Sequence, residues 1–195
     1  ECKAAHVLTV SLLWRHDFGV DRLLEDADDS AARLAAVQAY YPMGLLSGRG
    51  VHGHPIVVVR LGLSDPSASG RPNCYNDESG EEAWLRAHVW VNERAARVSP
   101  ERLVIMDLHN LSRVHVTRAA LASLQRSVAI DQRHYPGSVS RWYLINAPLL
   151  LRTVWSVVTS WLDPLSLEKV KVLGDVSDPS VAAELLEHVL ADVLP

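Results

Sequence analysis

The chain has 195 residues, a length that fits one domain with a sizeable hydrophobic core. Its formal net charge is −4, from 19 lysines and arginines against 23 aspartates and glutamates, and the cations are scattered. This distribution gives no support to nucleic-acid binding or to a polybasic membrane anchor. The two cysteines, Cys2 and Cys74, lie in unlike contexts, so a reducing compartment is a simpler interpretation than a disulfide framework.

Helical patterns come first along the chain. A helix is predicted over residues 4–15, with Gly19 as its C-terminal stop. Ser30 is suited to cap a second helix over residues 31–40, because its hydroxyl can accept a hydrogen bond from the first turn. The continuous apolar run 56–59 is typical of a strand that is covered on both faces.

Strands and helices alternate from this first strand onward. A loop of small and polar residues is expected over 63–80, and helices are expected over 81–98 and 117–133. A strand over 103–108 separates the two helices. The inward face of the first of these helices is expected to carry Trp84, Ala87, Val91 and Ala95. The alternation predicts an α/β fold with a mainly parallel sheet and crossover helices.

The most informative segment is a helix-length apolar run, 147–162, whose only charged residue is Arg152. An aromatic and branched run over 141–146 indicates a strand before it, Asp163-Pro164 breaks the helix, and 170–174 indicates another strand. A membrane-spanning helix needs about 20 apolar residues, so this run is too short to cross a bilayer. The protein must cover it, either in the core or as a lid over an apolar ligand.

Two adjacent stripes of this run are apolar at helical spacing. The first stripe consists of Leu150, Val154, Val157 and Trp161, and the second consists of Leu151, Trp155, Val158 and Leu162. A helix packed on one side needs a single stripe. The second stripe therefore faces either more core, as in an ordinary buried helix, or a ligand.

The patterns typical of enzymes and cofactor sites are not found in the sequence in their usual context. There is no Gly-x-Ser-x-Gly elbow and no Gly-rich phosphate loop, and the Gly-x-Gly-x-x-Gly match at residues 48–53 leads into the strand predicted over 56–59 and not into a helix. His52-x-His54 and Asp107-x-His109 are conceivable metal ligands, but solvated loop histidines are the favoured interpretation. Asp107 ends a predicted buried strand, where its carboxylate is suited to cap backbone amides. No catalytic residue, metal or cofactor is expected.

The order of several short motifs resembles the CRAL-TRIO lipid-binding domain, in particular the phosphatidylinositol and phosphatidylcholine transfer proteins of that family. The motifs are, in chain order, Trp14-Arg15-His16-Asp17-Phe18-Gly19, Tyr40-Tyr41-Pro42, Gly53-His54-Pro55, Val104-Ile105-Met106-Asp107-Leu108, Tyr135-Pro136, Ile145-Asn146-Ala147-Pro148, Leu162-Asp163-Pro164, Lys169 and Val172-Leu173-Gly174. The resemblance implies an α/β domain in which a mainly parallel sheet floors an apolar lipid pocket closed by a gate helix. Residues 1–195 are expected to form one such domain, with its N-terminal helical part and its C-terminal end truncated relative to the family.

The resemblance also implies the site residues. Arg15, His16, Ser166 and Lys169 match headgroup-binding positions of the family, where Arg and Lys would hold phosphate oxygens. The gate and pocket positions match Leu151, Val154, Trp155, Val158 and Leu162.

Several departures from the family pattern bear on the choice of lipid. Gly137 and Ser138 replace an acidic and a basic residue, and Arg102, Val104 and Asp131 stand at positions used for the phosphate of choline lipids. The resemblance therefore does not imply phosphatidylcholine binding in the manner of the yeast-type proteins.

The expected function is the binding, and the transfer between membranes, of a single lipid, with phosphatidylinositol preferred. Such a protein would be non-enzymatic and cytoplasmic and would associate transiently with membrane surfaces. Its partner would be a phospholipid or another hydrophobic ligand, with no nucleic acid involved. Two alternatives remain: a scaffold domain of the same fold that binds small GTPases or other proteins, and an α/β enzyme that acts on a lipid or ester.

Overall fold

The structure is a computed structural model that describes residues 2–25, 27–65 and 78–189. The helices are α1 (Cys2–Phe18), α2 (Val20–Glu25), α3 (Ala27–Gln38), α4 (Glu78–Ala96), α5 (Arg118–His134), α6 (Leu151–Thr159), α7 (Pro164–Glu168) and α8 (Pro179–Leu186). The strands are β1 (Met43–Arg49), β2 (Pro55–Arg60), β3 (Arg102–Asp107), β4 (Val139–Ile145) and β5 (Val170–Val172). Two short 3₁₀ helices, η1 (Leu61–Leu63) and η2 (Arg113–His115), complete the described elements.

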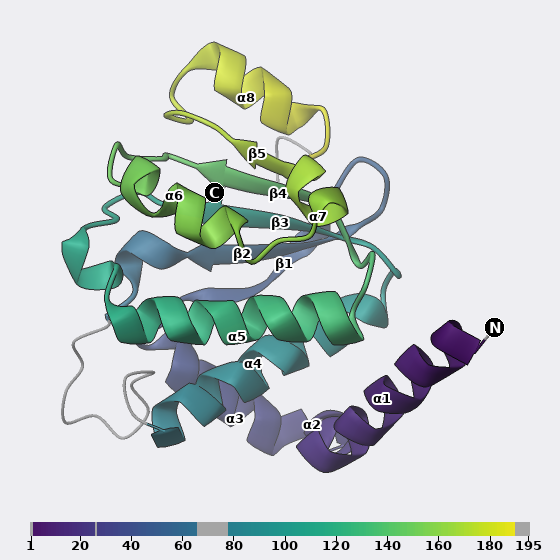
Figure 1. The fold of residues 1–195 in the computed structure, drawn as a ribbon. Helices are drawn as coiled ribbons and strands as arrows, with labels where there is room; N and C mark the ends of the chain where they lie inside the picture. The colour runs from purple at the N-terminus through teal and green to yellow at the C-terminus, as the bar shows by residue number, and fades with distance from the viewer. Residues whose placement is uncertain (1, 26, 66–77, 190–195) are drawn as a thin grey trace.

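The strands form one five-stranded sheet in the order β1-β2-β3-β4-β5 (Figure 1). The edge strand β1 runs antiparallel to β2, and the other neighbours are parallel. The α4 and α5 crossovers connect β2 to β3 and β3 to β4, while α6 and α7 lie between β4 and β5. The predicted α/β fold with a mainly parallel sheet is confirmed.

Alternate residues of each strand point to opposite faces of the sheet, and each face has its own core. One face carries Val57, Met106 and Leu144 and packs against residues of α4 and α6. The other face carries Ile105 and Tyr143 and is covered by residues of α8, including Leu185. Both faces of the central strands are therefore buried, as their continuous apolar runs predict.

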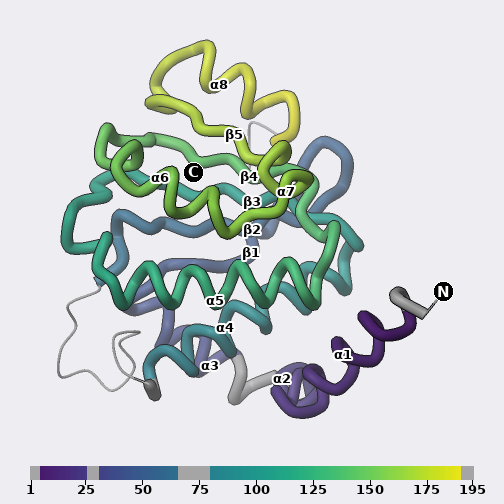
Figure 2. The backbone as a smooth tube through the Cα atoms, viewed as in Figure 1, coloured from purple at the N-terminus to yellow at the C-terminus, as the bar shows by residue number. Residues whose placement is uncertain are grey.

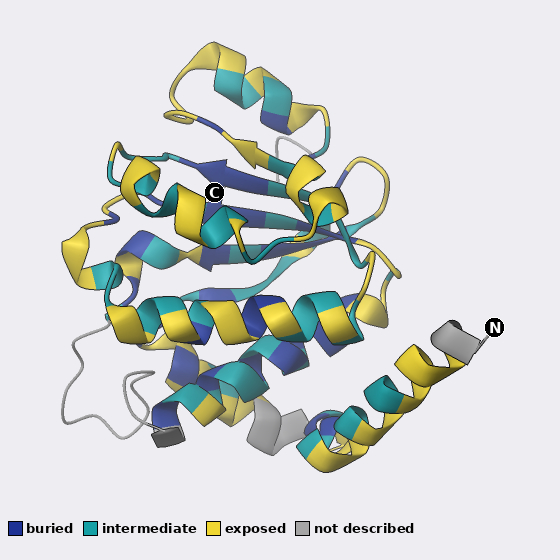
Figure 3. Cartoon of the chain, viewed as in Figure 1, coloured by how far each residue is buried: buried dark blue, intermediate teal, exposed yellow. Residues whose placement is uncertain are grey.

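Helix α4 anchors the helical layer to the first of these faces. Its residues Trp84, Ala87, Val91 and Ala95 are buried in the core, so the predicted inward face is confirmed. A separate small cluster joins α2 to α4 through Val20, Leu23 and Val89. Helix α1 extends away from the sheet (Figure 2), and much of its surface is exposed (Figure 3).

Three local features differ from the sequence predictions. Helix α3 begins at Ala27, so Ser30 lies within the helix and not at the N-cap position predicted for it. Strand β1 was not predicted, because its glycines and Ser47 break the apolar pattern of a strand. Helix α8 was not predicted either. Cys74 and most of the loop expected over 63–80 lie outside the described residues.

The predicted apolar helix over 147–162 is shorter than expected, since only Leu151–Thr159 is α-helical. The segment before it forms a tight turn in which the Leu151 amide donates to Pro148 O and the Arg152 amide donates to Leu149 O. After the helix, the Trp161 amide donates to Val158 O. These bonds span three residues, so both ends of the segment are wound more tightly than an α-helix.

Candidate functional site

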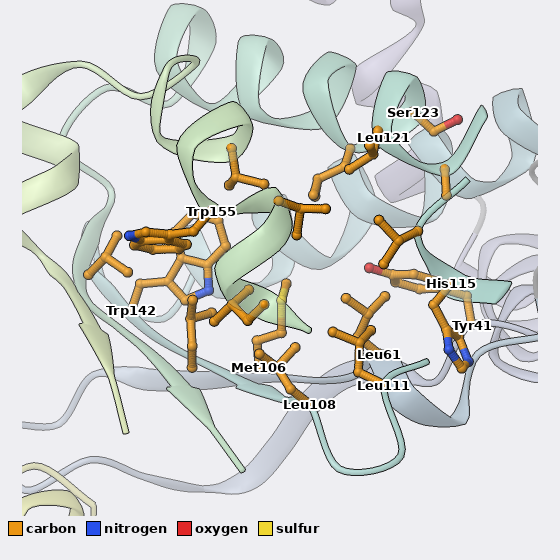
Figure 4. A pocket seen from close by; sticks show the side chains of 18 of the residues that line it. Tyr41, Leu61, Met106, Leu108, Leu111, His115, Leu121, Ser123, Trp142 and Trp155 are labelled. Atoms are coloured by element: carbon orange, nitrogen blue, oxygen red, sulfur yellow. The ribbon is translucent and has the colours of Figure 1, made fainter. Parts of the chain in front are cut away.

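An apolar cavity lies between the sheet and the helices that cover its first face. Its floor includes Met106 and Leu108 at the end of β3 and Trp142 and Leu144 in β4, and Leu121 is among the α5 residues that line it (Figure 4). The volume of the cavity is about 80 Å³. Ligand pockets in proteins usually have volumes of about 300–1,000 Å³, so this cavity is too small for an acyl chain unless a neighbouring element moves.

The helix α6 and its flanking turn form one wall of this cavity. The five predicted gate residues line it: Leu151, Val154, Trp155, Val158 and Leu162. No residue of α6 is buried. Val157, from the other predicted stripe, is 44% exposed and faces solvent. The helix thus covers the cavity with one face while its opposite face remains in water, which is the geometry that a movable cover requires.

A larger cavity of about 600 Å³ adjoins the apolar one. Its wall includes Asp131 and Tyr135 from the end of α5 and its C-cap, and Ser166 and Lys169 from α7 and its C-cap. Trp142 and Leu162 line both cavities, so the apolar space and the polar space meet at these side chains.

Lys169 and Ser166, two of the predicted headgroup residues, are brought together in this larger cavity. Lys169 Nζ donates to the Val139 carbonyl oxygen at 2.7 Å, and the Lys169 carbonyl oxygen accepts from the Trp142 amide at 2.9 Å. Ser166 Oγ donates to Asp163 Oδ2 at 2.6 Å. Asp163 caps α7, and the hydrogen bonds donated by Ser166 hold the pKa of the Asp163 carboxyl below its usual value. Ser166 is thus positioned by the capped helix α7, and Lys169 is positioned by its hydrogen bonds to β4.

Arg15 and His16 do not line either cavity. Arg15 binds Glu93 with both terminal nitrogens, one of them 3.2 Å from Oε2, and it also pairs with Asp21 at 3.3 Å. The hydrogen bond to Glu93 raises the pKa of the Arg15 guanidinium. The His16 side chain is 88% exposed and lies 3.1 Å from Asp17 Oδ1. The headgroup roles of these two residues therefore remain predictions.

One chain of contacts connects Arg15 to the larger cavity. Tyr135, which lines that cavity, donates its hydroxyl hydrogen to Glu93 Oε1 at 2.7 Å. Burial and this hydrogen bond raise the pKa of the Tyr135 phenol, so the hydroxyl remains a donor. Glu93 therefore holds Arg15 on one side and Tyr135 on the other.

A cluster of polar side chains around Asp131 forms part of the wall of the same cavity. Asp131 Oδ1 accepts from Asn92 Nδ2 at 2.7 Å and lies 2.9 Å from His88 Nε2, while Asp131 Oδ2 lies 3.7 Å from Arg102 Nη2. Arg102 is only 3% exposed, and its Nη1 donates to Ser138 Oγ at 2.7 Å. Burial alone would raise the pKa of Asp131, but His88, Arg102 and Asn92 outweigh it and the pKa is lowered.

Sequence reasoning did not identify Gln132, which joins α5 to the segment between α6 and α7. Its Nε2 donates to the Trp161 carbonyl oxygen at 2.7 Å, and its Oε1 accepts from the Asp163 amide at 2.8 Å. Gln132 follows Leu124 and Val128 in one helical stripe. A polar residue in line with an apolar stripe was the available signal.

The metal ligands considered from the sequence are not assembled into a site. Among the residues that the structure describes, no group of three or more His, Cys, Asp or Glu side chains is placed to hold a metal ion. Asp107 Oδ1 instead accepts from the His109 amide at 2.9 Å and from Asn146 Nδ2 at 2.8 Å, so the predicted capping role is confirmed. Nor is any helix within residues 2–25, 27–65 and 78–189 long and apolar enough to cross a membrane.

Comparison with known proteins identifies the class to which this arrangement of sheet and cavities belongs. A model of the CRAL/TRIO domain matches residues 39–195. The chain belongs to the CRAL/TRIO domain family, and the resemblance seen in its sequence motifs is confirmed. A crystal structure of Sfh5 has the same fold, with a TM-score of 0.68 at 13% identity over 91% of this chain and 63% of that one.

Several relatives are named as lipid transfer proteins. Two are phosphatidylinositol/phosphatidylcholine transfer proteins of Arabidopsis thaliana, SFH4 and SFH7, at 31% and 29% identity over 99% of this chain. The SEC14 cytosolic factor of Kluyveromyces lactis is 27% identical over 93% of this chain and 60% of its own length. The chain spans 32% and 35% of the lengths of SFH4 and SFH7.

Proposed function

We propose that this domain binds a single phospholipid and transfers it between membranes, without acting as an enzyme. The observation that carries the proposal is the junction of the two cavities: an apolar space beside α6 meets a polar space lined by Lys169 and Ser166. A phospholipid has the same two parts in the same order. The names of the relatives, transfer proteins and a cytosolic factor, support a cytoplasmic protein that visits membrane surfaces.

The apolar cavity would take the acyl chains. Each buried CH₂ group contributes about 0.8 kcal/mol, so an acyl chain provides enough free energy to drive the opening of a half-buried helix. Because the cavity of about 80 Å³ cannot hold such a chain, the loaded form requires outward movement of α6. Opening at a bilayer would then release the lipid where its chains can enter the membrane.

The larger cavity would take the headgroup, and phosphatidylinositol is our preferred ligand. Lys169 is held at the wall by the Val139 carbonyl oxygen, and a phosphate oxygen would be a stronger, charged acceptor for the same ammonium group. Ser166 offers a neighbouring hydroxyl, and the inositol hydroxyls would suit the polar wall around Asp131 and Tyr135.

Replacement of Lys169 by Ala tests the headgroup site. We expect the variant to lose affinity for phosphatidylinositol by about 1.5–3 kcal/mol, the contribution of a hydrogen bond to a charged group. The measurement is transfer of phosphatidylinositol from donor to acceptor vesicles, beside lipid extraction and mass spectrometry of the purified protein. Melting temperatures would show that both proteins are folded.

Lys171→Ala is the matched control. Lys171 lies two residues after Lys169, in β5, and its ammonium group pairs with Glu184 of α8 at 3.7 Å. Lys171 lines neither cavity. Its replacement should leave transfer unchanged. Equal transfer by wild type and Lys169→Ala would remove Lys169 from the site, and a folded wild type that takes up no lipid from any vesicle would overturn the proposed function.

A further inference from the structure

The indole nitrogen of Trp142 is a buried hydrogen-bond donor without an acceptor. Trp142 Nε1 is shielded from solvent and makes no hydrogen bond with any described residue. Buried donors in folded proteins nearly always have a partner, because an unpaired donor costs the free energy of its lost hydration. This N–H group therefore lacks the acceptor that buried donors normally have.

The position of Trp142 indicates the kind of acceptor that would satisfy it. Trp142 and Leu162 line both the apolar cavity and the polar cavity, so the indole stands at the boundary between them. Figure 4 shows the Trp142 ring among the apolar side chains of the cavity, on the same side as Trp155. An amphiphile that fills both spaces would place at this boundary the atoms that join its headgroup to its chains.

In a diacyl glycerophospholipid those joining atoms include two ester groups, and each ester carbonyl oxygen is a hydrogen-bond acceptor. We propose that the Trp142 N–H donates a hydrogen bond to an ester carbonyl oxygen of the bound lipid, so that the domain selects ester-linked over ether-linked glycerophospholipids. This inference rests on the proposed function. Trp142 would recognise the ester linkage of the lipid, whereas Lys169 and Ser166 would recognise its headgroup. An ether lipid lacks the carbonyl oxygen and would leave the donor unpaired.

The experiment compares two probes and two variants. The probes are vesicles of dioleoyl phosphatidylinositol and vesicles of its dialkyl ether analogue, which differ only in the two carbonyl oxygens. Wild type should bind the ester lipid about three- to tenfold more tightly than the ether lipid, the factor expected for one neutral hydrogen bond. Trp142→Phe keeps an aromatic ring but has no N–H, so its affinities for the two lipids should be nearly equal.

Trp155→Phe is the matched control, because Trp155 lines the apolar cavity but not the polar one. It should retain the ester preference of wild type. If Trp142→Phe does not fold, the same measurement is made on Trp142→Met, which also lacks the N–H group.

The outcomes separate this inference from the proposed function. A wild type that takes up neither lipid overturns both. A wild type that binds both lipids equally, or a Trp142 variant that keeps the full ester preference, overturns the role of Trp142 and leaves lipid binding intact.

Discussion

Asp131, in the wall of the larger cavity, is the carboxylate that pairs with buried Arg102. Replacing Asp131 by Asn removes the negative charge and leaves a cation that is 3% exposed without its counter-ion. We expect a loss of about 1–3 kcal/mol in the free energy of unfolding at neutral pH, less than for a fully buried pair because the Asp131 side chain is 28% exposed. Urea denaturation followed by circular dichroism measures it.

The same variant should change how stability depends on pH. The pKa of Asp131 is lower in the folded protein than in the unfolded chain, so its stabilising contribution is present above the unfolded value, about 3.9, and is lost as pH falls through the folded value. The wild type should therefore lose stability in acid more steeply than Asp131→Asn. Parallel stability profiles for the two proteins between about pH 2 and 5 would contradict this assignment. Glu187→Gln, at the exposed C-terminal end of α8, is the control for unrelated carboxylates.

Single residues were predicted best where local backbone chemistry decides their role. Asp107 caps the His109 amide as expected, and Asn110 adopts a φ of 64°, the left-handed conformation that its side chain tolerates. The surroundings of Arg15 were not predictable, because Glu93 lies 78 positions away in the sequence. Pairing between distant side chains depends on how helices pack, which local spacing does not reveal.

At the scale of elements, α6 is the part of the molecule whose role can be tested most directly. Val158 lines the apolar cavity, and Val158→Asp would place a charge where acyl chains are expected. Because no residue of α6 is buried, the variant should remain folded while its lipid content falls to background. Thermal melting and mass spectrometry of extracted lipid are the two measurements.

Val157→Asp is the matched control, since Val157 is the adjacent residue and is 44% exposed. It should bind lipid as wild type does. If Val158→Asp unfolds while Val157→Asp does not, α6 is an ordinary core helix and the argument for a movable cover fails.

The Gln132 side chain would restrain the proposed movement of α6, because it binds both Trp161 and Asp163. Gln132→Ala would remove two hydrogen bonds, each contributing about 1 kcal/mol, between α5 and the segment that follows α6. We expect faster amide hydrogen exchange near Asp163 and a severalfold faster transfer rate wherever opening limits transfer. Gln125→Ala, at an exposed position of the same helix, should alter neither; unchanged exchange in Gln132→Ala would show that these bonds do not restrain the segment.

Helices and strands were predicted best where the apolar residues recur at a clear helical or strand spacing. The inward face of α4 and the central strands follow from apolar periodicity and are confirmed. The extent of the α6 helix was overestimated, because a periodic pattern does not distinguish α-helical from 3₁₀ turns around Pro148 and Trp161. Strand β1 was missed since glycines obscured it.

At the scale of the whole molecule, the alternation of strands and helices was enough to predict a mainly parallel sheet, and the order of motifs was enough to predict the family. The layer on the second face of the sheet was not predicted. Its helix α8 contributes Leu185 to a core with Ile105 and Tyr143 from strands far away in the sequence, so its place depends on tertiary packing. The cavities likewise depend on which side chains meet across layers.

The segment that carries α6 is tied to the sheet at both of its ends. Before it, Asn146 donates through Nδ2 to Asp107 Oδ1 and its amide donates to Gly174 O; after it, the Lys169 carbonyl oxygen accepts from the Trp142 amide. Hydrogen bonds at two points restrain the segment from sliding along the sheet more than from rotating about the line that joins them. The outward movement of α6 that we propose would therefore be a rotation about this line, and Lys169 would keep its place beside β4 while the helix moves.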